Sequence, residues 1–299
     1  MMVHADAASF LLREGRHMRW TPGDRGNIED YRGRSAGGIA GLGIGGFLIL
    51  LVLSWATGTN LFSLLGNVTS SGPTSVGTSG ELRTSPAEEK LVDFVDAVTE
   101  DAQKAWERIL GSRYERTHVA LFRDAIQSAC GSAESATGPF YCPSDRKVYL
   151  DLGFFAELSQ RFGAPGDFAQ AYVITHEIGH HVQNLLGYTE RVRGSRSGAN
   201  SASVALELQA DCFAGVWGHA ASQQGRFQAG GVELEPGDAD EALRAAAAIG
   251  DDRLQRMSTG RVMPDRFTHG TSAQRVEWFQ RGMQSGDPRA CETFGTTTR

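Results

Sequence analysis

The sequence has 299 residues, of which 40% are hydrophobic and 21% are charged, and its formal net charge is −6. This length and composition suit one globular domain with appendages. An acidic chain gains no affinity for nucleic acid through counterion release, so no DNA or RNA partner is expected. The four cysteines form no C-x-x-C pair, which argues against a four-cysteine zinc site.

Residues 36–57, AGGIAGLGIGGFLILLVLSWAT, carry no charge and are long enough to cross a bilayer as one helix. The run is longer and begins later than the apolar part of a signal peptide, so we expect an uncleaved anchor. Six arginines precede it, and the first charged residue after it is Glu81. The positive-inside rule then predicts a single-pass protein of the cell membrane, with residues 1–35 in the cytoplasm and the remainder outside.

Residues 58–85 are rich in Gly, Ser and Thr towards their end and are predicted to be a flexible linker. The folded domain is predicted to cover residues 86–299. A short strand is expected at Lys147–Leu152 between Pro143 and Gly153. Apolar spacing and helix-ending residues predict helices over 86–111, 154–162, 167–186, 201–224, 238–257 and 271–283. The expected fold class is therefore mainly α (α+β), with a small sheet.

The segment VITHEIGHHVQ carries the clearest chemical signal, because His176, Glu177 and His180 form an H-E-x-x-H motif inside a predicted helix. Histidines four residues apart lie on one helix face, so both imidazoles can reach a single ion. Glu177 projects to the side, where a carboxylate can act as the general base for a metal-activated water. A chance match is the alternative, but apolar neighbours such as Val173 and Ile178 are typical of a buried helix.

The next predicted helix supplies a third metal ligand. Its ELQAD segment places Glu207 and Asp211 four residues apart on one face. We expect Glu207 to bind the metal and Asp211 to accept a hydrogen bond from the free N–H of a zinc histidine. Two acids on a solvated helix face are the alternative, although this helix is largely apolar. The sequence therefore predicts one Zn²⁺ per chain.

HEIGHHVQ followed by ELQAD resembles the gluzincin arrangement, in which H-E-x-x-H on one helix joins E-x-x-x-D on the next. The stretch from Met18 to Phe294 is similar to the family described as "putative neutral zinc metallopeptidase", which contains bacterial membrane-anchored proteins. The resembling segments are MRW, NIEDYRG, GPFYCPSD, VYLDLGFF, HEIGHHVQ, ELQADCFAGVW and HGTSAQRVEWF.

This resemblance implies a zincin-like metallopeptidase domain behind a single transmembrane helix, acting on a peptide or protein substrate. In proteases of this type an edge strand beside the metal holds the substrate backbone, and Lys147–Leu152 is the candidate. A strand that only covers the core is the alternative. His269 is a candidate donor to the oxyanion, and Arg275 is a candidate partner for Asp211 or the substrate. For both residues, a capped helix start with an ordinary ion pair is the alternative. His181 should point about 100° away from His180 and is expected to be structural.

The cysteines are predicted to pair if the domain is extracytoplasmic. Cys130 and Cys142 are close in sequence and are separated by a loop of small residues that can turn back. Cys212 follows Asp211 directly, and a bridge to Cys291 would tie the tail to the metal-binding helix. Ordinary buried thiols are the alternative.

The predicted function is hydrolysis of peptide bonds by a membrane-anchored zinc metalloendopeptidase with Glu177 as general base. The alternative is a membrane-tethered binding or scaffold domain that contains zinc without turnover. A structural zinc site is normally closed by four protein ligands, and the sequence supplies three, which favours catalysis. A binding module without metal would require both motifs to be coincidental.

Overall fold

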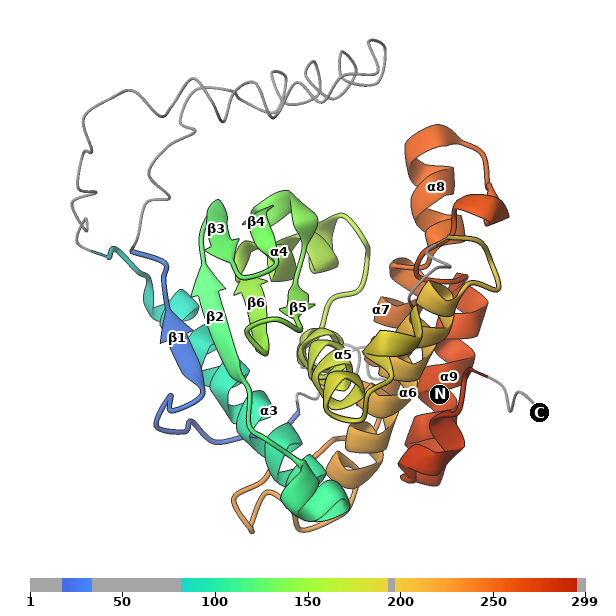
Figure 1. Ribbon diagram of the computed structural model, residues 1–299. Helices are drawn as coiled ribbons and strands as arrows, with labels where there is room; N and C mark the ends of the chain where they lie inside the picture. The colour runs from blue at the N-terminus through green and yellow to red at the C-terminus, as the bar shows by residue number, and fades with distance from the viewer. Residues whose placement is uncertain (1–17, 34–81, 193–196, 295–299) are drawn as a thin grey trace, which may run out of the picture.

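The computed structural model describes residues 18–33, 82–192 and 197–294, which form a mixed sheet packed beside a layer of helices (Figure 1). The strands are β1 (Ile28–Asp30), β2 (His118–Phe122), β3 (Ala125–Ser128), β4 (Gly131–Glu134), β5 (Phe140–Cys142) and β6 (Lys147–Asp151). The helices are α3 (Pro86–Leu110), α4 (Gly153–Gln160), α5 (Asp167–Leu185), α6 (Ala202–Ala221), α7 (Asp238–Ala248), α8 (Asp251–Thr259) and α9 (Ser272–Ser285). The fold is mainly helical with small sheets, as expected for an α+β class.

The main sheet has four strands in the order β1-β2-β6-β5. β1, β2 and β6 run parallel, whereas β5 runs antiparallel to β6 and forms one edge. The strand predicted at Lys147–Leu152 is confirmed as β6, but the expectation that it lies at an edge is wrong, because β2 and β5 pair with it on both sides. β5 takes the edge instead, and with three residues it is too short to show a recognisable alternation in the sequence.

Residues 18–33, called here the N-terminal arm, belong to the folded domain. The arm contributes β1, which lies beside β2. The buried side chain of Arg32 binds Glu88 and Glu89 in the first turn of α3 at 2.9 Å and 3.1 Å. The arm therefore packs against the domain predicted over residues 86–299.

Several segments lie outside the described residues. These are residues 1–17, the predicted transmembrane helix 36–57, most of the predicted linker 58–85, residues 193–196 and residues 295–299. Within the ranges 18–33, 82–192 and 197–294, no helix combines the length and the apolar character needed to cross a bilayer.

Most predicted helices are confirmed within a few residues, and one is corrected. The stretch 238–257 is two helices, α7 and α8, because the chain turns at Gly250. A Cβ at Gly250 would lie 2.3 Å from the backbone nitrogen of Ser272, so only glycine permits this approach. The turn places Asp251 at the start of α8, where its carboxylate accepts a hydrogen bond from the backbone N–H of Gly270.

α6 is the central helix and contacts α3, α5 and α9. Its approach to α9 is close, since a Cβ at Gly282 would lie 1.9 Å from the Cys212 carbonyl oxygen. On another side, the indole N–H of Trp217 donates to Asp101 of α3 at 2.9 Å. These contacts define the position of α6 relative to its neighbours and therefore the position of its carboxylates.

Both predicted disulfides are present. Cys130–Cys142 joins the turn after β3 to the edge strand β5, with Cα atoms 5.8 Å apart. Cys212–Cys291 joins α6 to the C-terminal segment, with Cα atoms 5.5 Å apart. One bridge therefore holds the edge strand, and the other holds the helix that carries Glu207.

Candidate metal centre and active-site cleft

α5 presents the two histidines of the H-E-x-x-H motif. The helix begins after Gly166, and most of its residues from Phe168 to Gln183 are buried. His176 and His180 lie one turn apart, with ring centroids 4.8 Å from each other and ring planes nearly perpendicular. The helix therefore directs two imidazoles toward the same point, as its spacing predicts.

α6 brings Glu207 to that point. One carboxylate oxygen lies 3.2 Å from His176 Nε2, and the other lies 3.5 Å from His180 Nε2. One donor atom from each of the three residues falls within 4.8 Å of the others. Two imidazoles and one carboxylate form a donor set that catalytic zinc sites use, so the residues fit the metal that the motifs predict.

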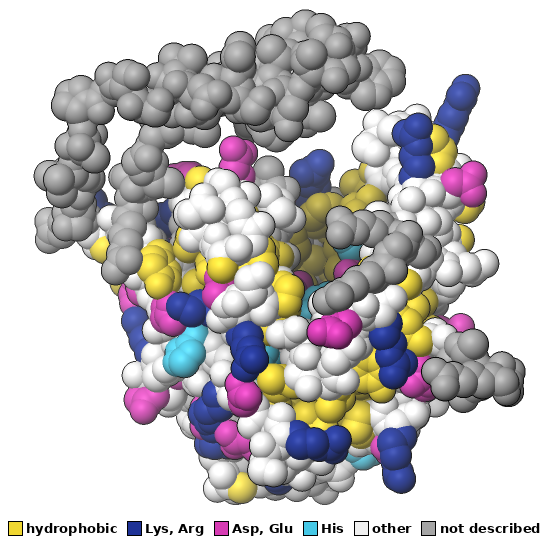
Figure 2. All heavy atoms as spheres, viewed as in Figure 1, with side chains coloured by type: hydrophobic (Ala, Val, Ile, Leu, Met, Phe, Trp, Pro, Cys, Tyr) yellow, Lys and Arg dark blue, Asp and Glu magenta, His cyan; other side chains and the backbone are white. Residues whose placement is uncertain are grey.

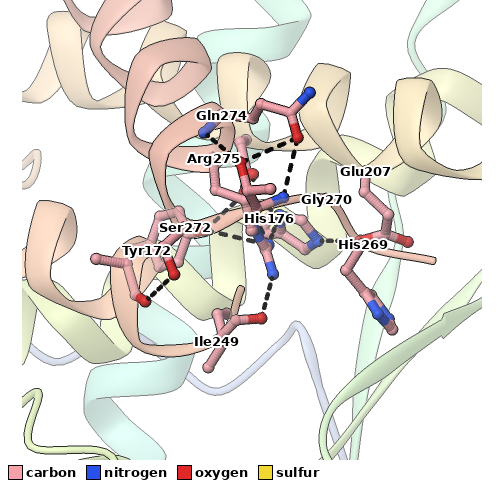
Figure 3. Close-up of polar contacts among 12 residues, drawn as sticks. Tyr172, His176, Glu207, Ile249, His269, Gly270, Ser272, Gln274 and Arg275 are labelled. Atoms are coloured by element: carbon pink, nitrogen blue, oxygen red, sulfur yellow. Dashed lines mark hydrogen bonds and ion pairs between the residues drawn. The ribbon is translucent and has the colours of Figure 1, made fainter. Parts of the chain in front are cut away.

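The other nitrogen of each histidine is held by a buried acceptor. Figure 3 shows His176 with Tyr172, Arg275 and Glu207 around it. His176 Nδ1 lies 2.8 Å from Asp211, as predicted. His180 Nδ1 lies 2.8 Å from the Gln183 side-chain oxygen. With Nδ1 protonated in both rings, each Nε2 is left free to face Glu207 and a metal.

Arg275 of α9 completes the support behind His176. Its guanidinium donates two hydrogen bonds to the Asp211 carboxylate, each 2.9 Å long. The hydroxyl of Tyr172 donates to the same carboxylate at 2.5 Å. Asp211 is fully buried, so each of these donors offsets the cost of burying its charge. Of the two roles considered for Arg275, the structure places it with Asp211.

The charges at the site favour ionised carboxylates. Burial would raise the pKa of Glu207, but His180 and His176 outweigh it and hold that pKa well below the usual value. Burial likewise opposes ionisation of Asp211, yet Arg275 and His176 lower its pKa. Burial also lowers the pKa of His176, but Asp211 and Glu207 outweigh it and raise that pKa to about 10. A divalent cation would take the place of protons shared within this cluster.

Comparison with known proteins agrees with this geometry. The profile of the family described as "Putative neutral zinc metallopeptidase" matches residues 18–294. The chain belongs to this family. It is 44% identical over 294 residues to the uncharacterized protein YpfJ of Escherichia coli (strain K12), covering 93% of this chain and 99% of that relative. It is 47% identical over 204 residues to the uncharacterized protein Rv2575 of Mycobacterium tuberculosis (strain H37Rv), covering 67% and 69%. No solved structure matches it.

In this member of the zinc metallopeptidase family, the three donor residues line a cleft of about 620 Å³. Glu177 lines the same cleft beside them, as the motif predicts. Figure 2 shows the face of the molecule hollowed between the sheet and α8, with hydrophobic side chains along the hollow. The cleft is large enough for several residues of a peptide. Its apolar lining includes Phe140, Phe154, Phe162, Ile249 and Leu254.

His269 lies at the cleft beside Glu207. Its Nδ1 is 3.3 Å from an Asp251 carboxylate oxygen, and half of the side chain is exposed. The other Asp251 oxygen accepts backbone N–H groups from Thr268, His269 and Gly270. Asp251 raises the pKa of His269. The ring therefore lies in the cleft with Nδ1 directed at Asp251 and Nε2 on its other side.

Three supporting residues were not assigned a role from the sequence. Gln183 belongs to the HEIGHHVQ segment, and its place three residues after His180 is a usable signal, because such residues share a helix face. Tyr172 precedes His176 by one turn and carries the same signal. Asp251 had no local signal, since its partner His269 is 18 residues away and the turn at Gly250 was not predicted.

A second acidic group lies elsewhere in the fold. Asp167, Asp238 and Glu241 bring carboxylate oxygens within 4.8 Å of one another. Burial and the neighbouring Asp167 raise the pKa of Glu241. This group contains no histidine or cysteine, so its donor set differs from those of zinc sites.

Proposed function

We propose that this chain is a zinc-dependent peptidase that binds one Zn²⁺ through His176, His180 and Glu207. The observation that carries the proposal is a set of three protein donors facing a cleft, with the Glu177 carboxyl beside them. Three protein donors leave one tetrahedral position for water, as in catalytic zinc sites. A bound zinc ion would supply Lewis-acid polarisation and lower the pKa of water toward about 7.

Glu177 would move the proton in hydrolysis. Its carboxylate accepts a proton from water while the water oxygen attacks the carbonyl carbon of the peptide bond. The same carboxyl then donates that proton to the leaving nitrogen as the C–N bond breaks. Water thereby supplies a hydroxyl group to the carbonyl carbon and a proton to the nitrogen. The products are a carboxylic acid and an amine, and the acid then loses its remaining proton to solvent.

His269 would stabilise the negative charge that develops on the carbonyl oxygen. Its Nδ1 lies beside Asp251, which favours protonation of the ring, and a protonated ring would present the Nε2 N–H as the donor. Because the side chain is half exposed at the cleft, it can reach a bound peptide. This assigns His269 the role of oxyanion donor, and Arg275 the role of supporting Asp211.

β5 is the surface that would hold the substrate backbone. It is the antiparallel edge of the sheet, and Phe140 and Tyr141 line the cleft. An extended peptide can add to such an edge through main-chain hydrogen bonds. The substrate class we propose is therefore an extended or unfolded segment of polypeptide.

A zinc-containing domain without turnover is the competing function. Such a site would be closed by a fourth protein ligand. Within the described ranges, the donor group at this position contains His176, His180 and Glu207 and no fourth residue. Hydrolysis uses a carboxylate such as Glu177 beside the metal and a cleft for the substrate. A purely structural site needs neither.

Cleavage of an unfolded protein substrate tests the proposal directly. We expect zinc-loaded wild type to cleave it, and Glu177→Gln to lose at least about 10³-fold in kcat while keeping its zinc, because only the general base is removed. Glu277→Gln is the matched control, since Glu277 is exposed on α9 and pairs with Arg281.

Metal analysis accompanies every assay. Retained activity in Glu177→Gln would contradict the general-base role. An inactive wild type with one bound zinc would favour the domain without turnover.

A further inference from the structure

The edge strand β5 is tied to the metal-binding helix through one tyrosine. The Tyr141 hydroxyl lies 3.0 Å from His181 Nδ1. Asn184, one turn later on α5, donates its side-chain N–H to the same hydroxyl at 3.1 Å. The Asn184 amide also donates to the Pro143 carbonyl just after β5, at 3.4 Å. Two α5 side chains therefore hold both the middle and the end of the strand.

The direction of these hydrogen bonds follows from the second nitrogen of His181. His181 Nε2 lies 2.6 Å from the backbone carbonyl oxygen of Glu115, which can only accept, so Nε2 carries the proton. Nδ1 is then an acceptor, and the Tyr141 hydroxyl donates to it. Burial raises the pKa of Tyr141 to about 12, so the hydroxyl keeps this proton at neutral pH.

The histidine ring is itself held in place. It packs edge-on against Tyr114 and Tyr141, with ring centroids 5.6 Å and 5.4 Å away. Its exposed fraction is zero. Because the imidazole is fully buried, with Nε2 donating and Nδ1 accepting, its ring has one orientation. The Tyr141 hydroxyl that donates to Nδ1 therefore also has one position.

His181 immediately follows the metal ligand His180, and Tyr141 is the central residue of β5. These contacts therefore join the strand directly to the helix that carries the metal donors. We infer that Tyr141, His181 and Asn184 act as a positioning clamp that sets β5 at the distance at which an extended peptide reaches the metal. The inference rests on the proposed function, because it deepens how that site would bind its substrate.

The clamp has a consequence that a purely structural contact would lack. A long peptide uses the edge of β5, whereas a dipeptide analogue held by the metal donors does not. Loosening β5 should therefore weaken binding of the long substrate selectively. The clamp residues do not contact reacting atoms, so zinc content and the chemical step should be unaffected.

The test compares Tyr141→Phe and Asn184→Ala with the control Tyr149→Phe. Tyr149 is the neighbour of Phe140 in the sheet, but its hydroxyl donates to Asp145 rather than to α5. For a ten-residue peptide we expect KM to rise about 10-fold in the first two variants, with kcat within about twofold. For a blocked dipeptide, kcat/KM of Asn184→Ala should stay at the wild-type value, because Asn184 does not line the cleft. The control should match wild type on both substrates.

Binding measured in the Glu177→Gln background separates this inference from the proposed function. Fluorescence anisotropy of a labelled ten-residue peptide should show Kd about 10-fold weaker when Tyr141→Phe is added, at equal zinc content. An unchanged Kd would overturn the clamp whether or not the wild type hydrolyses peptides. Equal losses on long and short substrates would also overturn it, since they would indicate a general structural effect. Tyr141→Phe and Asn184→Ala both remove the hydrogen bond between these two side chains. If one variant misfolds, the other still tests the inference.

Discussion

The N-terminal arm and the helix pair that carries the metal donors are built from different kinds of contact. On α5 and α6, the functional side chains repeat at one-turn spacing, and each helix can present them once it is packed. The arm has little regular structure and depends on partners far along the chain. Asn27, for example, binds Asp96, Glu100 and Gln103 of α3. The metal site is therefore a property of two rigid helices, while the integrity of the sheet depends on a segment outside residues 86–299.

Removing the arm is expected to have the largest effect. A chain that begins at residue 82 lacks β1, the buried side chain of Met18 and the Arg32 ion pairs. We expect this truncation to aggregate or to lose cooperative unfolding, because an apolar surface and the carboxylates of α3 are left without partners. Circular dichroism during thermal denaturation, compared with a chain beginning at Met18, measures the effect. A truncation as stable as the longer chain would contradict the role given to the arm.

The two regions also differ in how far the sequence could predict them. His176, Glu177, His180 and Glu207 were found because helical spacing is local and metal chemistry restricts the residue types. Cys130–Cys142 was predicted from adjacency and a loop of small residues. Cys212–Cys291 was predicted because Cys212 lies on the metal-binding helix and Cys291 in the tail. β6 was the only strand predicted. β1 to β5 were missed because strands of three to five residues show little alternation, and their pairing depends on partners elsewhere in the chain. The break between α7 and α8 was missed because it depends on the approach of Ser272 to Gly250.

The packing of the arm bears on the predicted membrane orientation. That prediction puts residues 1–35 in the cytoplasm and residues 86–299 outside, yet the arm and the domain form one folded unit in the structure. A folded unit lies on one side of a bilayer, whereas a single crossing at residues 36–57 would separate the arm from the domain. The orientation stays a prediction, and this difference makes it testable. The two disulfides favour an oxidising compartment for this unit.

Labelling with a membrane-impermeant maleimide tests this point. Thr21→Cys in the arm and Gln224→Cys in the domain are both at exposed positions, and all four native cysteines are in disulfides. We expect both sites to be labelled in intact spheroplasts. Labelling of Gln224→Cys alone, with Thr21→Cys labelled only after lysis, would restore the single-pass orientation and contradict the packing of the arm.

A smaller effect is expected behind the metal site. Asp211→Ala removes the acceptor of His176 Nδ1 and should weaken zinc binding by about 10–100-fold. It also leaves the buried Arg275 without its carboxylate, so stability should fall as well. Competition with a chromogenic chelator gives the affinity, and denaturant titration gives the stability. If Asp211→Ala removes zinc entirely while Glu207→Ala keeps it, the two roles are reversed.

The smallest effect is expected within the arm. Asn27→Ala removes the amide that donates to Asp96 and leaves the buried Gln103 NH2 group without its acceptor. This should lower the free energy of unfolding by about 1–3 kcal/mol. Thr21→Ala, at an exposed arm position, is the control and should change it by less than about 0.5 kcal/mol. Zinc affinity should be equal in both variants. A loss of zinc affinity in Asn27→Ala would mean that the two regions are coupled.

The central claim is that His176, His180 and Glu207 hold a single zinc ion with one position open. Anomalous diffraction from crystals of the zinc-loaded protein, collected at the zinc absorption edge, measures this most directly. We predict one peak between α5 and α6, with two histidine nitrogens and a Glu207 oxygen at about 2.0–2.2 Å and a solvent molecule as the fourth ligand. A fourth protein ligand would contradict catalysis, and a sole peak at Asp167, Asp238 and Glu241 would contradict the site itself.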